Sequence, residues 1–229
     1  MRVGSLLKSS FIDYPDRIAA VLFTRGCNFR CPYCHNRELL ESDGPLLLPD
    51  EIDRVLAPRI KYLDGLVISG GEPTLHPDLP DWIRHLKKTT GLAIKLDTNG
   101  TQPGVLRRLI RDGLVDFVAM DVKGPSTRLP EVAGRLVDVG AIRESVRLLM
   151  EGDLPYEFRT TVARELLSPD DLTQLAEEIS GARRYVLQSF RDNDEVLAGP
   201  GLYSPYTPAE MEQFRKNLQQ HFETMLVRG

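Results

Sequence analysis

Short apolar runs alternate with amphipathic stretches along this chain, and this alternation limits the fold more than any other feature. The apolar runs are continuous, which is typical of parallel strands that are covered on both faces. The predicted strands are Ile18–Thr24, Leu66–Ser69, Ala93–Asp97, Phe117–Asp121, Tyr156–Val162 and Tyr185–Ser189.

The stretches between these runs have helical spacing and helix-end signals. Gly113 and Gly152 follow two of them directly, and Ser168 and Thr207 stand before Pro169 and Pro208 as N-cap residues. The predicted helices are Pro49–Leu63, Leu79–Thr89, Pro103–Asp112, Ala141–Glu151, one that begins after Ser168, and one from Thr207 to about His221.

A strand followed by a helix, repeated about six times, predicts an α/β fold with right-handed crossovers. The 229 residues fall short of the roughly 250 that a full eight-unit barrel needs. We therefore expect a partial (β/α)6 TIM-like barrel in a single domain, residues 1–229, with a doubly wound open sheet as the alternative. The segment Asp192–Tyr206 is expected to be a surface loop.

Composition excludes several other classes. A hydrophobic content of 41% suits an ordinary globular domain, and a net charge of −4 does not suggest a nucleic-acid binder. No signal-peptide pattern and no apolar run of membrane-spanning length is present, so we expect a cytoplasmic protein without membrane contact.

The three cysteines, Cys27, Cys31 and Cys34, form one cluster with the spacing C-x₃-C-x₂-C. Clustered cysteines in a reducing compartment indicate metal binding, although an oxidised pair that leaves one odd thiol stays open. Structural zinc and cubane iron–sulfur clusters both use four ligands. Three thiolates on a four-iron cluster would leave one iron free to bind a substrate or cofactor.

Polar residues and glycines follow the ends of the predicted strands, where parallel α/β folds collect their chemistry. We expect these strand ends to converge on one rim. In chain order they carry the cysteine loop, Ser69-Gly70-Gly71-Glu72-Pro73, Asp97-Thr98-Asn99-Gly100, Asp121-Val122-Lys123, Arg159, and Gln188-Ser189-Phe190.

Several of these residues have simpler interpretations when each is taken alone. Gly70-Gly71 and Asn99-Gly100 could be only tight turns. Asp121 and Lys123 could form an ion pair. Arg159 on a buried strand requires an anionic partner, which is either a protein acid or a ligand carboxylate.

Two further residues lie within or beside the cysteine loop. Tyr33 could be ordinary packing, but it is also placed to stack on a planar ring. His35 is interpreted as a wall of the pocket and not as a fourth ligand, because the four histidines show no metal-ligand spacing with one another.

Asp97 would lie at the end of a predicted buried strand, where a carboxylate without a partner is energetically costly.

Taken together, the motifs resemble those of the radical S-adenosylmethionine (SAM) enzymes. The cysteine spacing with an aromatic before the last cysteine resembles that superfamily's signature, and Gly70-Gly71-Glu72-Pro73 resembles its motif for the methionine amino group. The segments Ser10–Pro15, Gly26–Asn36 and Phe158–Val162 are similar to the activating enzymes of glycyl-radical proteins. Within that group, Ser10–Pro15 and Phe158–Val162 are most similar to the anaerobic ribonucleoside-triphosphate reductase activating proteins.

This resemblance implies an oxidoreductase with one [4Fe–4S] cluster on Cys27, Cys31 and Cys34, and with SAM on the open iron. Reductive cleavage of SAM to a 5′-deoxyadenosyl radical and abstraction of hydrogen from a partner glycine are then expected, so no side chain is expected to act as a catalytic residue. The implied SAM contacts are Tyr33 and His35 at the adenine, Gly70, Gly71 and Glu72 at the amino group, Asp121 and Lys123 at the methionine end or ribose, and Arg159 at the carboxylate.

The resemblance also implies finer features. A monovalent cation at Asp97, Thr98 and Asp121 would match the pyruvate formate-lyase activating enzymes. Those enzymes have Pro-Tyr-His where this chain has Gln188-Ser189-Phe190, which argues against that substrate and leaves the ribose contact at Gln188 open. The absence of a second cysteine-rich insert predicts a single cluster.

The implied partners are a glycyl-radical protein, expected to be the anaerobic ribonucleotide reductase, and flavodoxin or ferredoxin as electron donor. One alternative is a radical SAM enzyme that acts on a small molecule, similar to the 7-deazaguanine synthases. A second is an activase of another glycyl-radical enzyme, such as pyruvate formate-lyase. A third is a metal-binding or electron-transfer module without SAM cleavage.

Overall fold

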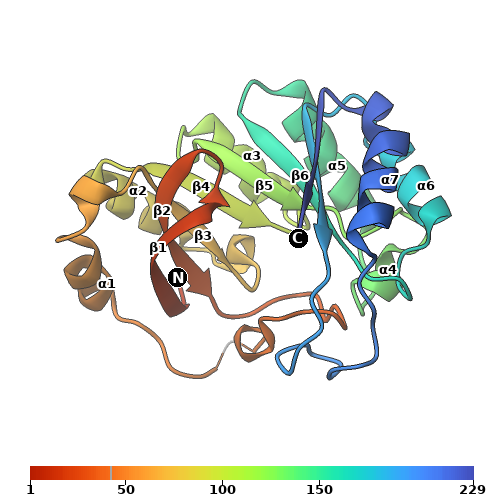
Figure 1. Cartoon of the computed structure of the whole chain (residues 1–229). Helices are drawn as coiled ribbons and strands as arrows, with labels where there is room; N and C mark the ends of the chain where they lie inside the picture. Colours follow the sequence, from red (N-terminus) through yellow and green to blue (C-terminus); the bar gives the residue numbers. More distant parts are fainter. Residues whose placement is uncertain (42) are drawn as a thin grey trace. The chain divides into compact units, whose positions relative to one another are not determined.

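Strands and helices alternate along the chain in the computed structural model, which describes residues 1–41 and 43–229 (Figure 1). Contacts between Cα atoms group the chain into two compact units. The first unit contains Met1–Asn28, Glu38–Thr98 and Gln102–Val118, and the second contains Phe29–Arg37, Asn99–Thr101 and Ala119–Gly229. The prediction of a single domain stays a prediction.

The first unit is built on a hairpin followed by parallel strands. Strands β1 and β2 pair antiparallel, and β2, β3 and β4 then pair parallel in chain order. Tyr14, Ala19, Val21 and Val67 form a buried core cluster, against which Phe117 packs. The elements of this unit are β1 (Val3–Tyr14), β2 (Arg17–Thr24), α1 (Pro49–Leu56), β3 (Gly65–Gly70), α2 (Leu79–Thr90), β4 (Ala93–Thr98) and α3 (Pro103–Arg111).

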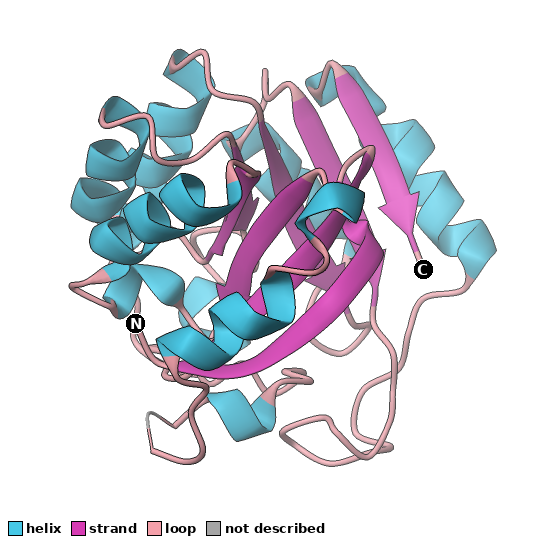
Figure 2. Ribbon diagram, turned by 90° about the vertical axis from the view of Figure 1, so that its left-hand side faces the viewer, coloured by secondary structure: helices cyan, strands magenta, loops and turns pink. Residues whose placement is uncertain are grey.

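The second unit contains a parallel arrangement of β6, β7 and β8, again in chain order. Helices run alongside the strands (cyan and magenta in Figure 2), and α7 contacts both β7 and β8. Strand β5 (Phe117–Asp121) begins in the first unit and ends in the second. The other elements are α4 (Leu129–Val132), α5 (Val139–Glu151), β6 (Tyr156–Val162), α6 (Pro169–Glu178), β7 (Arg184–Ser189), α7 (Pro208–Leu218) and β8 (Thr224–Arg228).

All the predicted strands are present, and the structure adds β1 and β8. Most of β1 is exposed between Ser5 and Asp13, so it lacks the continuous apolar run by which the other strands were recognised. The predicted helix Pro49–Leu63 is wrong in its second half. It ends at Leu56, and a short 3₁₀ turn, Ile60–Tyr62, follows. Pro58 explains the break, because a proline has no backbone N–H to continue the helical hydrogen bonds.

The helix ends follow the signals in the sequence. Ser168 accepts from the amide of Asp171, and Thr207 accepts from the amide of Glu210, each as part of a complete capping box. Gly113, one residue beyond the C-cap of α3, has a φ of 63°, the left-handed geometry for which glycine is suited.

Neighbouring strands within each unit are also neighbours in the sequence. A doubly wound sheet reverses its strand order at a switch point. The parallel pairs β2–β3–β4 and β6–β7–β8 show no such reversal, which favours the barrel-type arrangement. Within the described residues, no helix is long and apolar enough to cross a membrane.

Candidate active site

The end of β3 is held by backbone contacts that only glycines allow. Gly71 donates its amide to the Thr24 carbonyl, and Glu72 donates to the Gly26 carbonyl, both at 2.8 Å. A Cβ on Gly71 would lie 2.1 Å from the Gly26 oxygen, and Gly70 has a φ of 114°. The Gly-Gly pair therefore joins β3 to the residues that lead into the cysteine loop.

Glu72 is a buried carboxylate, 1% exposed, in the first unit. The Thr98 hydroxyl donates to its Oε1 at 2.7 Å, and the amide and hydroxyl of Thr74 donate to the same oxygen. These donors supply hydrogen bonds to one oxygen of the buried carboxylate and fix its orientation. Glu72 and Thr98 were both predicted site residues from different strand ends, and the structure brings them together.

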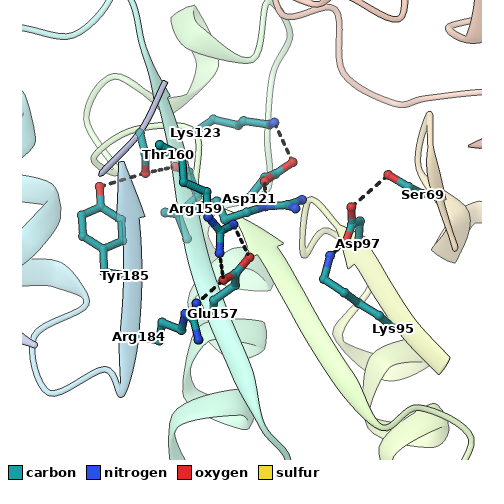
Figure 3. Close-up of polar contacts among 12 residues, drawn as sticks. Ser69, Lys95, Asp97, Asp121, Lys123, Glu157, Arg159, Thr160, Arg184 and Tyr185 are labelled. Atoms are coloured by element: carbon teal, nitrogen blue, oxygen red, sulfur yellow. Dashed lines mark hydrogen bonds and ion pairs between the residues drawn. The ribbon is translucent and has the colours of Figure 1, made fainter. Parts of the chain in front are cut away.

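Asp97, at the end of β4, has two polar partners in the same unit. The Ser69 hydroxyl donates to its Oδ2 at 3.0 Å, and the ammonium of Lys95 pairs with its Oδ1 (Figure 3). Lys95 is fully buried. The sequence analysis did not single out Lys95, although a lysine within an apolar strand is itself a signal that a buried anion is near.

In the second unit, the Asp121 carboxylate accepts hydrogen bonds from two cationic side chains. Arg159 Nε donates to Oδ1 at 2.8 Å and Lys123 Nζ donates to Oδ2 at 3.1 Å, so the expected ion pair of Asp121 and Lys123 is present (Figure 3). Burial alone would raise the pKa of Asp121, but the two cations hold it well below its usual range. The anionic partner that Arg159 requires is thus a protein acid in this structure.

Hydrogen bonds join the strands that carry Asp121, Lys123 and Arg159. The Val122 amide donates to the Arg159 carbonyl at 2.9 Å. The Thr160 hydroxyl donates to the Val122 carbonyl at 2.7 Å, and the Tyr185 hydroxyl donates to Thr160 at 2.9 Å. These bonds fix the end of β5 against β6, and so they fix the position of the Asp121 carboxylate.

Cys31, Tyr33 and Cys34 belong to the second unit, and Lys123 lies close to this part of the loop. Burial raises the pKa of the Cys31 thiol, and the nearby Lys123 ammonium opposes the rise. The same ammonium lies 6.0 Å from the centre of the Tyr33 ring. A positive charge next to Cys31 favours the thiolate, which is the form that binds metal.

The cysteine loop is also held by the segment Asp192–Tyr206. The amides of Leu197 and Ala198 donate to the carbonyls of Cys34 and Pro32, at 2.9 and 3.0 Å. That segment contains no strand or helix, as expected for a loop, but Val196 within it is fully buried. A segment far along the chain therefore holds the backbone of the cysteine loop in place.

Two further predicted site residues lie on the second unit. His35 Nε2 donates to the Arg191 carbonyl at 2.6 Å, and its ring lies against Phe190 with centroids 5.6 Å apart. Gln188, on β7, is in register with Thr161 on one side and with Arg228 on the other. Asn99-Gly100 forms a turn, in which the Asn99 side chain accepts from the Thr101 amide.

The predicted site residues thus fall into two groups, one on each unit. Within the first, Glu72 and Thr98 are in contact, and Asp97 pairs with Lys95. Within the second, Asp121, Lys123 and Arg159 are in contact. The first group contains Cys27, Gly70, Gly71, Glu72, Asp97 and Thr98, and the second contains Cys31, Tyr33, Cys34, His35, Asp121, Lys123, Arg159 and Gln188.

Comparisons with known proteins identify the class. A family model of the radical SAM superfamily matches residues 21–179. A protein of Methanocaldococcus jannaschii that has the provisional name glycyl-radical enzyme activating enzyme MJ1227 is 33% identical over 196 residues, which cover 84% of this chain and 81% of that protein. The pyruvate formate-lyase-activating enzyme of Clostridium pasteurianum is 32% identical over 127 residues, covering 53% of this chain and 52% of that enzyme.

Solved structures agree on the fold. SuiB of Streptococcus suis, in a crystal structure bound to S-adenosylmethionine, superposes with a TM-score of 0.68 at 12% identity over 91% of this chain. This chain spans 52% of the SuiB chain. The predicted fold class, an α/β fold of the partial barrel type, is confirmed by such neighbours.

The chain belongs to the radical SAM superfamily and, within it, to the glycyl-radical enzyme activating group. It is therefore an enzyme, and the cofactors of its family are a [4Fe–4S] cluster and SAM.

The cysteines have the chemistry that such a cluster requires. None of the three forms a disulfide within the described residues, and Cys31 is buried while the other two are partly exposed. Among the residues that the structure describes, no three His, Cys, Asp or Glu side chains gather as ligands of a single metal ion. Thiolates are the ligands that hold iron–sulfur clusters, and the cysteine loop offers three of them.

Proposed function

We propose that this chain activates a glycyl-radical protein, with Cys27, Cys31 and Cys34 as ligands of one [4Fe–4S] cluster. When bound, the cluster and SAM supply one-electron cleavage of the sulfonium bond to a 5′-deoxyadenosyl radical, which removes a hydrogen from a partner glycine. The observation that supports this best is the similarity to the M. jannaschii activating protein, because it extends over most of both chains.

The chain's own residues would bind and orient SAM. We propose that Glu72, with Gly70 and Gly71, holds the methionine ammonium. Its buried carboxylate is already oriented by Thr74 and Thr98, which supports this role. A preoriented carboxylate loses little freedom when it binds a cation.

The second group would bind the rest of SAM. Arg159 is proposed for the methionine carboxylate, with Asp121 holding its guanidinium in place at 2.8 Å. Lys123 is proposed for the methionine end or ribose, Tyr33 and His35 for the adenine, and Gln188 for the ribose. All of these residues belong to one compact unit, which supports a shared role.

A monovalent cation at Asp97, Thr98 and Asp121 is a separate proposal. The Lys95 ammonium already neutralises Asp97 and competes with such a cation. Activity that is equal in potassium and in choline salts would contradict the proposed cation site.

The partner proposed here is an anaerobic ribonucleotide reductase, with flavodoxin or ferredoxin as the electron donor. Its support is the similarity of Ser10–Pro15 and Phe158–Val162 to the activating proteins of that reductase. We propose a cytoplasmic location, because the chemistry requires reducing conditions.

The test is the formation of a protein radical under anoxic conditions. The reconstituted chain is mixed with SAM, a reductant and the candidate reductase, and we expect a glycine-centred electron paramagnetic resonance signal on the reductase. Cys31→Ala is expected to abolish both SAM cleavage and this signal, whereas Thr173→Ala, on the exposed face of α6, leaves both intact.

The small-molecule alternatives give a different result. If the wild-type chain cleaves SAM in the presence of a purine-derived substrate but forms no radical on any glycyl-radical protein, the activase proposal is wrong. A signal on pyruvate formate-lyase, and none on the reductase, would instead change only the partner. Unchanged SAM cleavage in Cys31→Ala would exclude the cluster assignment.

A further inference from the structure

The hydroxyl of Tyr33 is buried without a hydrogen-bond partner. The side chain is 5% exposed, and no acceptor or donor among the described residues satisfies its oxygen. A buried hydroxyl normally finds a partner, since leaving it unpaired sacrifices its bonds to water. An unpaired hydroxyl in the cysteine loop therefore indicates a hydrogen bond that forms only when the loop has bound its ligand.

The Cys31 thiol is a polar neighbour of this hydroxyl. The two groups are close enough to influence each other's ionisation, but they do not form a well-aligned hydrogen bond. Lys123 lies over the ring of Tyr33. A positive charge thus lies near both the hydroxyl and the thiol of a predicted cluster ligand.

The loop is also prevented from turning this hydroxyl towards water. The Cys34 amide donates to the Cys31 carbonyl at 3.0 Å across Tyr33. Leu197 and Ala198 bind the backbone on the two sides of Tyr33, at Cys34 and Pro32. A side chain held in this way is preorganised for an acceptor that arrives with the cluster.

We propose that the Tyr33 hydroxyl donates a hydrogen bond to the Cys31 sulfur in the cluster-loaded enzyme, and that this bond raises the reduction potential of the cluster. The inference rests on the proposed function only in that the cluster binds at Cys31. It assigns Tyr33 a role as a positioning and tuning residue, in addition to any contact with adenine.

The direction of the effect follows from charge. Reduction adds an electron to the cluster and increases the negative charge on its sulfur ligands. A hydrogen bond to such a sulfur stabilises the reduced form more than the oxidised form, and so it raises the potential. Low exposure strengthens this interaction, because little water competes for the sulfur.

The experiment measures the potential of the reconstituted protein without SAM, in a redox titration followed by electron paramagnetic resonance. Tyr33→Phe keeps the ring and removes the donor, so we expect a shift to a more negative potential. The Fe–S(Cys) stretching bands in resonance Raman spectra should move to higher frequency, since the sulfur no longer shares electron density with a hydrogen-bond donor.

Tyr185→Phe is the matched control. It also removes a hydroxyl from a buried tyrosine of the second unit, but that hydroxyl donates to Thr160 at 2.9 Å. We expect the control to keep the wild-type potential. Circular dichroism establishes that each variant is folded, and iron and sulfide content establishes its loading.

The outcomes separate the two proposals. A wild-type chain that binds no four-iron cluster contradicts the proposed function. If wild type and Tyr33→Phe both load and have the same potential, the inference is overturned while the proposed function stands. A folded Tyr33→Phe protein that loads no cluster also overturns it, because losing one donor should shift the potential without abolishing binding.

Discussion

Single residues in this chain show two kinds of constraint. Some are fixed by the backbone around them, as Gly71 is by the Gly26 carbonyl. Others are fixed by charge, as Asp121 is by Arg159 and Lys123. The sequence pattern identified both kinds as unusual, but it could not separate a ligand contact from an internal one. That distinction depends on distances between strand ends.

Gly71→Ala tests the backbone constraint. Its Cβ would overlap the Gly26 oxygen, so we expect the free energy of unfolding to fall by about 2–3 kcal/mol in urea titrations. Gly104→Ala is the control, since a Cβ there meets nothing within 4 Å and lies in α3. It should be neutral or stabilising by up to about 1 kcal/mol. Equal effects of the two substitutions would contradict this explanation.

Lys95, Ser69 and Thr74 are the polar residues that sequence reasoning missed. Each acts through a carboxylate that was predicted, Asp97 for the first two and Glu72 for the third. A buried carboxylate requires donors, but here its donors come from another strand or from residues two positions away on either side. The sequence therefore predicts that donors exist without identifying them.

At the scale of elements, local signals predicted helix beginnings well. Ser168 and Thr207 cap α6 and α7 as expected, because a cap depends on four or five consecutive residues. Strand existence was also predicted wherever the strand is buried on both faces. The edge strand β1 and the short β8 were missed because their patterns depend on what covers them.

The cap of α7 should give a pH-dependent stability. A hydrogen bond from Arg164, together with bonds from the Thr207 amide and hydroxyl, lowers the pKa of Glu210 from its ordinary 4.5 to about 2. Its stabilisation is complete above the unfolded pKa and is lost as the pH falls through the folded one. In thermal unfolding, the melting temperature of the wild type should exceed that of Glu210→Gln by the largest margin at pH 6.

The same difference should shrink as the pH is lowered towards 3. Glu177→Gln is a matched control, because it replaces an exposed carboxylate on a neighbouring helix, α6. The comparison uses differences between variants at each pH, so the general effect of acid cancels. A gap between wild type and Glu210→Gln that stays constant or widens with acid would contradict the assignment.

At the scale of the whole molecule, long-range ion pairs join segments that no local pattern connects. Glu157, on β6, is almost completely buried and accepts two bonds of 3.0 Å from Arg228, on β8. Arg184, on β7, lies 3.3 Å from the same carboxylate (Figure 3). One acid thus ties together three strands of the second unit.

Arg228→Met should lower the free energy of unfolding by about 2 kcal/mol. This is less than the roughly 3–5 kcal/mol expected for a fully buried pair, because Arg184 remains and Arg228 is partly exposed. Arg215→Met breaks the exposed pair with Glu212 on α7 and should cost less than about 1 kcal/mol. If the two variants unfold at the same urea concentration, Glu157 is not a tie between strands.

The sequence by itself determined the alternation of strands and helices, the helix caps and the residue types at the strand ends, because these depend on short-range periodicity and local hydrogen bonding. It also identified the cysteine loop and the family. Only the tertiary structure decided that Gly71 fits against Gly26, that Lys95 neutralises Asp97, that Arg159 binds Asp121, and that the Tyr33 hydroxyl is left unpaired beside Cys31. The first and third of these contacts join segments that are far apart in the sequence, and in all four the burial that makes the contact energetically decisive is a property of the folded chain.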